Sequence, residues 1–327
     1  MYETSTLRLR AATMDDLPAV HAVAMRAAKR DDTGELFELE DLREEWRRVG
    51  FDPTTDVLLA LDEEGDLLGY AEAGVSSAPR DGEIRAHVMG VTDPAFRGRG
   101  VASALLPWCL ERARAKAQRD HPGVPVVVAA WGRQEDSDSA ALLADAGMTP
   151  ARYFSDMRVT LADWEDPGTP LPVGARAPRD GDEEAVRLTH NEAFADHWGS
   201  SDQTPERWGD MWRRRVGRPQ LSRIAVGDAS DGLGERVLAY VLTQEWQEGE
   251  AYVALVGTAR AARGRHLATA LLTDVVRACR DAGLRRVELG VDAASPTGAN
   301  GVYERVGFSV VRRGVSMALP AWTPPAG

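Results

Sequence analysis

The sequence lacks any run of about 18 apolar residues, which a membrane-spanning helix would need. Its first ten residues, MYETSTLRLR, lack the basic-then-apolar order of a signal peptide. Cysteine is scarce, because only Cys109 and Cys279 occur, each in a different half of the chain and inside a helix-like pattern. We therefore expect a cytoplasmic protein whose two thiols are buried and unreactive, with no disulfide.

Positive charge is also in short supply. The chain has 39 Lys+Arg against 51 Asp+Glu, for a net charge of −12, and its only lysines are Lys29 and Lys116. Such a chain repels nucleic acid and anionic membranes, so we expect neither as a partner. It attracts cationic ligands such as amines weakly at physiological salt, although solubility alone would also explain the charge. No histidine–carboxylate pattern indicates a metal site.

The chain repeats itself. FRGRGVASALL (Phe96–Leu106) and ARGRHLATALL (Ala262–Leu272) agree at seven of eleven positions and lie 166 residues apart. Arg10 and Asp16 return at the same offset as Arg176 and Asp182. The 327 residues suffice for two domains of ordinary size, and the Pro- and Gly-containing stretch before Gly174 has no apolar period. We therefore predict tandem domains over residues 1–162 and 173–327, joined by a linker over residues 163–172.

Each half predicts the same order of elements. A short strand and an apolar-periodic helix come first, followed by a Trp-containing helical stretch and two strands. A third strand, HVMGV (His87–Val91) or YVALVGT (Tyr252–Thr258), leads into the repeated motif and a helix. A strand, a short helix and a closing strand finish each half. This order predicts an α/β fold: in each half, a mixed sheet with helices on its faces.

The repeated motif has the parts of a pyrophosphate site. It follows a strand and opens a helix, so the first N–H groups of the helix and the positive end of its dipole face a ligand. Glycine allows close backbone approach, and arginine adds charged donors. Neither the P-loop nor the dinucleotide-binding glycine pattern is present. The candidate phosphate-binding residues are Arg97, Gly98, Arg99, Gly100, Val101, Ala102 and Ser103 in the first half, and Arg263, Gly264, Arg265, His266, Leu267, Ala268 and Thr269 in the second.

The R-G-x-G-x-A pattern after a strand resembles the acyl-CoA signature of the GCN5-related N-acetyltransferases (GNAT). SPTGANGVYERVGF (Ser295–Phe308) is similar to a later segment of that family, so the resemblance covers nearly the whole chain as two GNAT-like domains. It implies acetyl-CoA, or another short acyl-CoA, as cosubstrate. It also implies that backbone N–H groups of a splayed strand face the thioester carbonyl. The residues concerned are Leu255, Val256 and Gly257 in the second half, and Met89, Gly90 and Val91 in the first.

The two halves differ at a position that matters for catalysis. Aligning Gly307-Phe308 with Gly147-Met148 places Tyr303 opposite Leu143. The resemblance implies that a tyrosine here protonates the departing CoA thiolate, which leucine cannot do. We therefore expect the C-terminal half to be catalytic. His266 replaces Gly100, however, and would be strained if the turn needs a positive φ, so the first half has the better phosphate loop and the opposite assignment stays open.

A general base is harder to choose. Candidates are Glu245 and Glu250, with Asp292 and Glu192 as further carboxylates. We expect an N-acetyltransferase that moves an acetyl group from acetyl-CoA to a primary amine of a small molecule by direct attack. A non-catalytic acyl-CoA-binding sensor or scaffold is the alternative, and protein acetylation is a third possibility. The chain could be a monomer or a homodimer.

Overall fold

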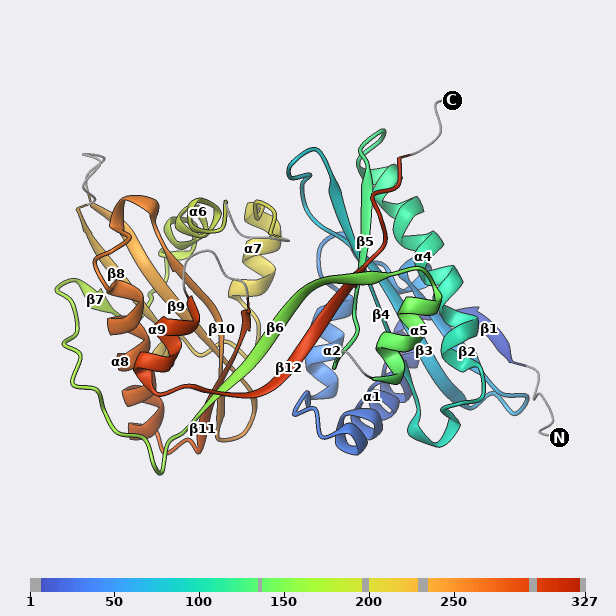
Figure 1. Cartoon of the computed structure of the whole chain (residues 1–327), viewed down its shortest axis with the longest axis horizontal. Coiled ribbons are helices and arrows are strands. Elements are labelled where there is room, and N and C mark those ends of the chain that lie inside the picture. Colours follow the sequence, from blue (N-terminus) through green and yellow to red (C-terminus); the bar gives the residue numbers. More distant parts are fainter. Residues whose placement is uncertain (1–6, 135–136, 196–199, 229–234, 294–298, 324–327) are drawn as a thin grey trace. The chain divides into compact units, whose positions relative to one another are not determined.

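The computed structural model describes residues 7–134, 137–195, 200–228, 235–293 and 299–323. The chain forms two compact units, one of residues 1–151 with 315–327 and the other of residues 152–314. Each unit is a mixed β-sheet with helices on both faces (Figure 1). The predicted α/β class is therefore confirmed.

Up to its last helix, the first unit follows the order expected from its half of the sequence. Its sheet runs β1-β2-β3-β4-β5-β12, with β4 and β5 parallel and the other pairs among β1 to β5 antiparallel. Its elements are β1 (Arg8–Ala11), α1 (Leu17–Asp31), α2 (Leu39–Trp46), α3 (Pro53–Asp56), β2 (Val57–Leu61), β3 (Leu67–Val75), β4 (Ile84–Thr92), α4 (Val101–Asp120), β5 (Val126–Trp131), α5 (Asp138–Asp145) and part of β12 (Ser309–Ala318).

The second unit repeats this arrangement. Its sheet runs β7-β8-β9-β10-β11-β6, with β10 and β11 as the parallel pair. Its elements are most of β6 (Thr149–Thr160), then β7 (Ala175–Arg176), α6 (Glu183–Ala193), α7 (Pro205–Trp212), β8 (Arg223–Asp228), β9 (Glu235–Gln247), β10 (Glu250–Thr258), α8 (Leu267–Asp281), β11 (Arg286–Asp292) and α9 (Ala299–Val306).

The repeated Arg and Asp near the start of each half have a structural role. Arg10 donates two hydrogen bonds to Asp16, at 2.8 and 2.6 Å, where the chain enters α1. Arg176 and Asp182 make the same pair before α6, at 2.6 and 2.9 Å. The arginine bonds lower the pKa of both carboxyls. These ion pairs tie the first strand of each unit to its first long helix.

Two helix layers cover each sheet. In the first unit, α1 and α2 pack on one face through Val23 and Trp46, while α4 packs on the other through Leu105 and Cys109. In the second, α6 and α7 cover one face, and α8 and α9 cover the other. Both cysteines are free and buried, as predicted, and burial raises the pKa of each thiol to about 12. The thiols are therefore protonated and poor nucleophiles at neutral pH.

The parallel strand pair of each unit separates part-way along. Pairing of β4 with β5 ends at Val88 and Ala130, and pairing of β10 with β11 ends at Tyr252 and Glu288. In the second unit, β10 also shifts register against β9 between Val253 and Leu255, which marks a β-bulge. The pairing of β4 with β3 has no such shift. A bulge bends its strand and redirects backbone groups. β10 pairs with β11 over three residues, whereas β4 pairs with β5 over five.

The closing strands differ from the prediction. We expected each to complete its own half, which is wrong. β6 pairs with β11 of the second unit, from Thr160–Arg286 to Phe154–Asp292, and β12 pairs with β5 of the first, from Ser316–Trp131 to Ala318–Ala129. The apolar pattern of a strand predicts that it will join a sheet but not which of two similar edges it will join, because the ladder is made by backbone groups.

The stretch expected as a linker also lies within the second unit. Trp164 is 9% exposed and donates a hydrogen bond from Nε1 to the carbonyl of Val306 at 2.6 Å. Asp166 pairs with Arg277 at 2.7 Å. Residues 163–172 therefore run along the surface of one unit, because a tryptophan and an ion pair hold them there.

The exchange of closing strands, in which β6 joins the second unit and β12 the first, predicts where a core substitution acts. Val315, in the second sequence repeat, is fully buried in the core of the first unit. We expect Val315→Ala to lower stability by about 2 kcal/mol, because two buried methyl groups are lost. Native-state hydrogen exchange should become faster in β5 and leave β11 unchanged. The matched variant Val306→Ala should affect the second unit instead, and faster exchange in β11 from Val315→Ala would contradict the strand assignment.

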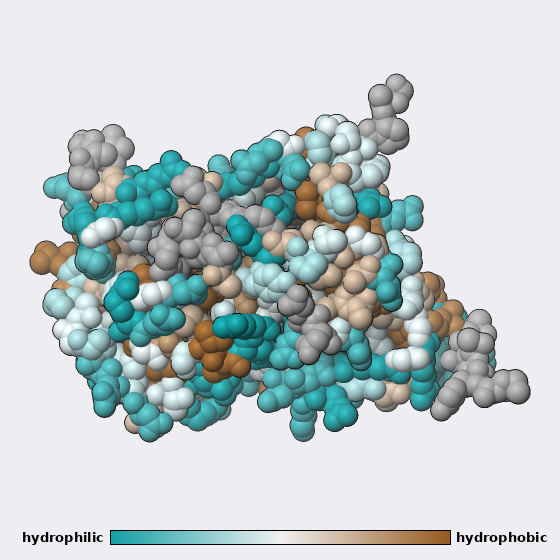
Figure 2. Space-filling model, viewed as in Figure 1, coloured by the Kyte–Doolittle hydropathy of each residue, from teal (hydrophilic) through white to brown (hydrophobic). Residues whose placement is uncertain are grey.

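Figure 2 shows hydrophilic side chains over much of the visible face, with apolar residues scattered among them. Of the helices in the described ranges, none is both long enough and apolar enough to span a bilayer.

Candidate active site

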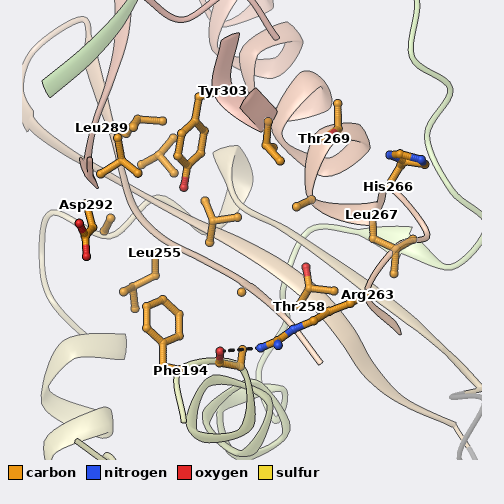
Figure 3. Close-up of a pocket in the computed structure, with 18 of the residues that line it drawn as sticks. Phe194, Leu255, Thr258, Arg263, His266, Leu267, Thr269, Leu289, Asp292 and Tyr303 are labelled. Atoms are coloured by element: carbon orange, nitrogen blue, oxygen red, sulfur yellow. Dashed lines mark hydrogen bonds between the residues drawn. The ribbon is translucent and has the colours of Figure 1, made fainter. Parts of the chain in front are cut away.

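A cavity of about 570 Å³ opens in the second unit where β10 and β11 separate. This is within the size range of small-molecule sites. Figure 3 shows the side chains that line it, spread between its two ends. Arg263, His266 and Thr269 lie toward one end, near the start of α8, and Tyr303 and Asp292 lie toward the other. The cavity therefore joins a cationic helix start to a buried tyrosine.

The helix start has the geometry expected of a phosphate loop. Gly264 has φ 78°, and His266 has φ 56° at the N-cap of α8. Gly98 and Gly100 have φ 73° and 81° in the first copy, so the two turns share one backbone shape. Histidine in this region costs about 1 kcal/mol relative to glycine, yet its N–H stays in place.

Most of the predicted loop residues reach the cavity. Arg263 holds the turn against α6 by donating a hydrogen bond to the carbonyl of Ala193 at 3.1 Å, drawn in Figure 3. Arg265 alone of the predicted second-copy loop is absent from the described lining. The loop residues that line the cavity are Arg263, Gly264, His266, Leu267, Ala268 and Thr269.

The other end is built around Tyr303 on α9. Tyr303 is 8% exposed. Its ring packs edge-on against Phe308, with ring centres 6.1 Å apart, and its hydroxyl points into the cavity (Figure 3). Burial, with a smaller contribution from Tyr252, raises the pKa of Tyr303 to about 12. The hydroxyl therefore keeps its proton throughout the neutral range and can donate it to a developing anion.

The bulged part of β10 forms one wall of the cavity. Leu255, Val256 and Gly257 all line it, beyond the last pair that β10 makes with β11. The ring of Tyr240 lies against Gly257, since a Cβ there would stand 2.4 Å from its Cε1. These residues pair with β9 on one side, and on the other side, where β11 has separated, their backbone groups face the cavity.

The matching cavity of the first unit is small, at about 90 Å³. Leu143 lines it at the position of Tyr303, together with Met89, Gly90, Val91 and Ala102 from the predicted set. The first-copy loop residues that do not line it are Arg97, Gly98, Arg99, Gly100, Val101 and Ser103.

One of the two arginines in the first loop is bound to a carboxylate of the same unit. Arg97 donates two hydrogen bonds to Asp31, at 2.6 and 2.8 Å, and these bonds lower the pKa of that carboxyl. An internal carboxylate thus takes the contacts that a phosphate would need. In the described residues, the first unit therefore has the smaller cavity and an ion-paired loop arginine.

Comparison with known proteins shows which family has this sequence and fold. The family model described as "Acetyltransferase (GNAT) family" matches residues 22–121 and 185–308, one match in each repeat. The chain belongs to the GNAT acetyltransferase family. The tandem arrangement and the N-acetyltransferase activity expected from the sequence are confirmed.

Individual proteins of similar sequence or structure are also acetyltransferases or GNAT proteins by name. A mycothiol acetyltransferase of Thermobispora bispora is 32% identical over 304 residues, covering 91% of this chain and 94% of the relative. A crystal structure of a GCN5-related N-acetyltransferase from Sphaerobacter thermophilus has a TM-score of 0.73 and 28% identity, and covers 100% of this chain and 98% of its own. A tandem GNAT protein from the clavulanic acid biosynthesis pathway shares the fold, with a TM-score of 0.66, 19% identity and coverage of 98% and 100%.

The two favoured general bases of this acetyltransferase lie away from the described lining of the cavity. Glu245 accepts from Arg218 at 2.8 Å and from the N–H of Gly249 at 2.9 Å. Burial raises the pKa of Glu245, but these bonds outweigh it and the net shift is downward, which weakens it as a base. Glu250 is bound by Arg285 at 3.0 Å and also by Arg286. Both carboxylates are committed to arginines.

The other two candidate bases differ in position, because one lines the cavity and the other does not. Glu192 accepts from the N–H of Arg260 at 2.6 Å and from Arg236 at 2.8 Å, so it braces the loop before α8. Asp292 lines the cavity and is 3.5 Å from Nε of Arg152. Of the four, Asp292 is the carboxylate that the fold brings to the cavity.

Sequence reasoning missed several lining residues of the acetyltransferase. Phe154 comes from β6, which the sequence assigns to the first half, so only the strand exchange brings it here. Phe194 follows α6 in the stretch THNEAF and carries no motif. Residues 295–298, the start of the later family segment, lie outside the described residues. Histidine with phenylalanine four residues on was the available signal for Phe194, since both share a helical face.

Proposed function

We propose that this chain is an acetyl-CoA-dependent N-acetyltransferase that works in its second unit and acetylates a primary amine of a small molecule. The observation that carries the proposal is that one continuous cavity runs from the start of α8 to the hydroxyl of Tyr303. Its cationic end suits the pyrophosphate of CoA. Residues Val253 to Thr258 of β10 line it, so the pantetheine arm would lie along this strand, with Tyr303 where the thioester would end.

The proposed reaction is direct transfer. The neutral amine attacks the thioester carbonyl carbon, the new N–C bond forms and the C–S bond breaks. Backbone N–H groups of Leu255 to Gly257 stabilise the oxyanion that develops on the carbonyl. Tyr303 gives its proton to the departing thiolate, whose conjugate acid has a pKa of about 8.5. The nitrogen releases its surplus proton, for which Asp292 is the candidate acceptor.

The acceptor class follows from the relatives and from charge. Relatives that are 30% and 32% identical to this chain are named mycothiol acetyltransferases. We therefore propose the amine acceptor of those enzymes as the first substrate to assay, with glucosamine and spermidine beside it. A net charge of −12 favours approach of a cationic amine.

A calorimetric titration with acetyl-CoA should give one site per chain. The reason is that the second unit has a cavity of about 570 Å³ and the first about 90 Å³, with Arg97 bound to Asp31. Mass spectrometry of the amine panel should then detect an acetylated product. Binding without a product from any amine would support a non-catalytic acyl-CoA-binding module instead. Two equal sites would contradict the assignment of the second unit alone.

A further inference from the structure

A buried aromatic cluster lies beneath the bulged strand of the second unit. Nδ1 of His190 is hydrogen-bonded to the hydroxyl of Tyr240 at 2.6 Å, and the two side chains are 5% and 0% exposed as residues. His190 stacks on Phe194 with ring centres 4.5 Å apart and planes 23° apart. The ring centre of Trp208 lies 4.9 Å from that of His190. The cluster is therefore fixed from several sides.

Phe194 lines the cavity, and Tyr240 contacts a residue that lines it. Tyr240 pairs with Gly257 across β9 and β10, and its ring fills the space where a Cβ of Gly257 would stand. Phe194 lines the cavity beside Leu255 (Figure 3). The bond between His190 and Tyr240 thus connects the backbone of β10 to an aromatic wall of the same cavity.

The first unit shows that the fold does not need this cluster. Its matching tyrosine, Tyr70, is also buried and pairs with Val91. At the offset of the repeat, Ala24 and Ala28 stand in place of His190 and Phe194. The same layers form around alanine, alanine and valine, and the resulting cavity is only about 90 Å³. The histidine, phenylalanine and glycine occur together in the unit with the large cavity.

We propose that His190 and Tyr240 are positioning residues that hold Phe194 and Gly257 around the acyl group and so restrict transfer to acetyl. This inference rests on the proposed function. A rigid aromatic wall beside the thioester position leaves little room for a longer acyl chain, because a well-packed buried ring yields only at a cost in stability. Loss of the hydroxyl of Tyr240 would free His190 and Phe194 to move apart from β10.

The test compares one substitution at matched positions in the two units. Tyr240→Phe and Tyr70→Phe each remove one buried hydroxyl, and initial rates are measured with acetyl-CoA and hexanoyl-CoA on the best amine of the panel. We expect Tyr240→Phe to lower the acetyl-over-hexanoyl ratio of kcat/KM at least roughly fivefold, since a few methylene groups are discriminated by fit. Tyr70→Phe should leave that ratio unchanged. Phe194→Ala should lower it further, and Phe194→Leu should restore part of it.

The outcomes are distinguishable. A purely structural role predicts that both tyrosine variants melt at lower temperature with unchanged acyl selectivity, and that result would overturn the inference. Calorimetric affinity for acetyl-CoA should stay within about twofold in Tyr240→Phe, because the phosphate loop is untouched. If Phe194→Ala does not fold, Phe194→Leu still reports a changed ratio. Absence of any transfer by the unaltered enzyme would instead refute the proposed function, and this inference with it.

Discussion

Tyr303→Phe should lower kcat by roughly 100-fold or more, because it removes the proton that the departing thiolate needs. The ring that packs against Phe308 is kept, so the fold and the affinity for acetyl-CoA should change little. Steady-state rates with both substrates saturating would measure the loss, and calorimetry would measure the affinity. Loss of kcat at constant Kd separates an acid in catalysis from a residue that holds the cosubstrate.

A matched control and a pH profile sharpen this test. Tyr153→Phe makes the same chemical change at an exposed site of the same unit and should leave kcat unchanged. Burial raises the pKa of Tyr303 to about 12, so the acid stays protonated and kcat should not fall from its ionisation up to about pH 10. A descending limb near pH 10 that vanishes in Tyr303→Phe would contradict the buried geometry. Unchanged kcat in Tyr303→Phe would exclude the role altogether.

The elements that could be predicted from sequence are those fixed by local pattern. The Arg-Gly-Arg turns, the helices after them and the strands before them all follow from apolar period, glycine and the repeat itself. The sequence also indicated that His266 would be strained if the turn needs a positive φ, and the residue has a positive φ. Tyr303 and Leu143 line corresponding cavities, as the alignment of the two halves implied.

What could not be predicted depends on partners distant in sequence. Nothing in the apolar pattern of β12 distinguishes β5 from β11 as its neighbour, so the strand exchange and the arrival of Phe154 at the cavity were missed. The commitment of Glu245 to Arg218 depends on a loop that packs against the end of β9. Candidate bases chosen by residue type alone could not be separated, because each carboxylate's role is set by the arginines around it.

The repeat also supplies a control for the phosphate loop. Gly264→Glu should weaken acetyl-CoA binding at least roughly 100-fold, because it places a carboxylate beside the expected pyrophosphate and blocks close backbone approach. Gly98→Glu makes the same change in the first unit. The two glycines have φ 78° and 73°, and a Cβ at either would meet no other atom within 4 Å. Backbone strain is therefore nearly equal in the two variants, and the difference between them isolates the ligand.

Calorimetry on both variants decides which unit binds. We expect Gly98→Glu to keep the affinity for acetyl-CoA within about twofold, since Arg97 is already bound to Asp31 and the first cavity is about 90 Å³. Equal thermal stability of the two variants would show that the lost binding in Gly264→Glu is not a loss of fold. If Gly98→Glu abolished binding and Gly264→Glu did not, the strained loop at His266 would be the inactive one, and the cavity in front of Tyr303 would need another ligand.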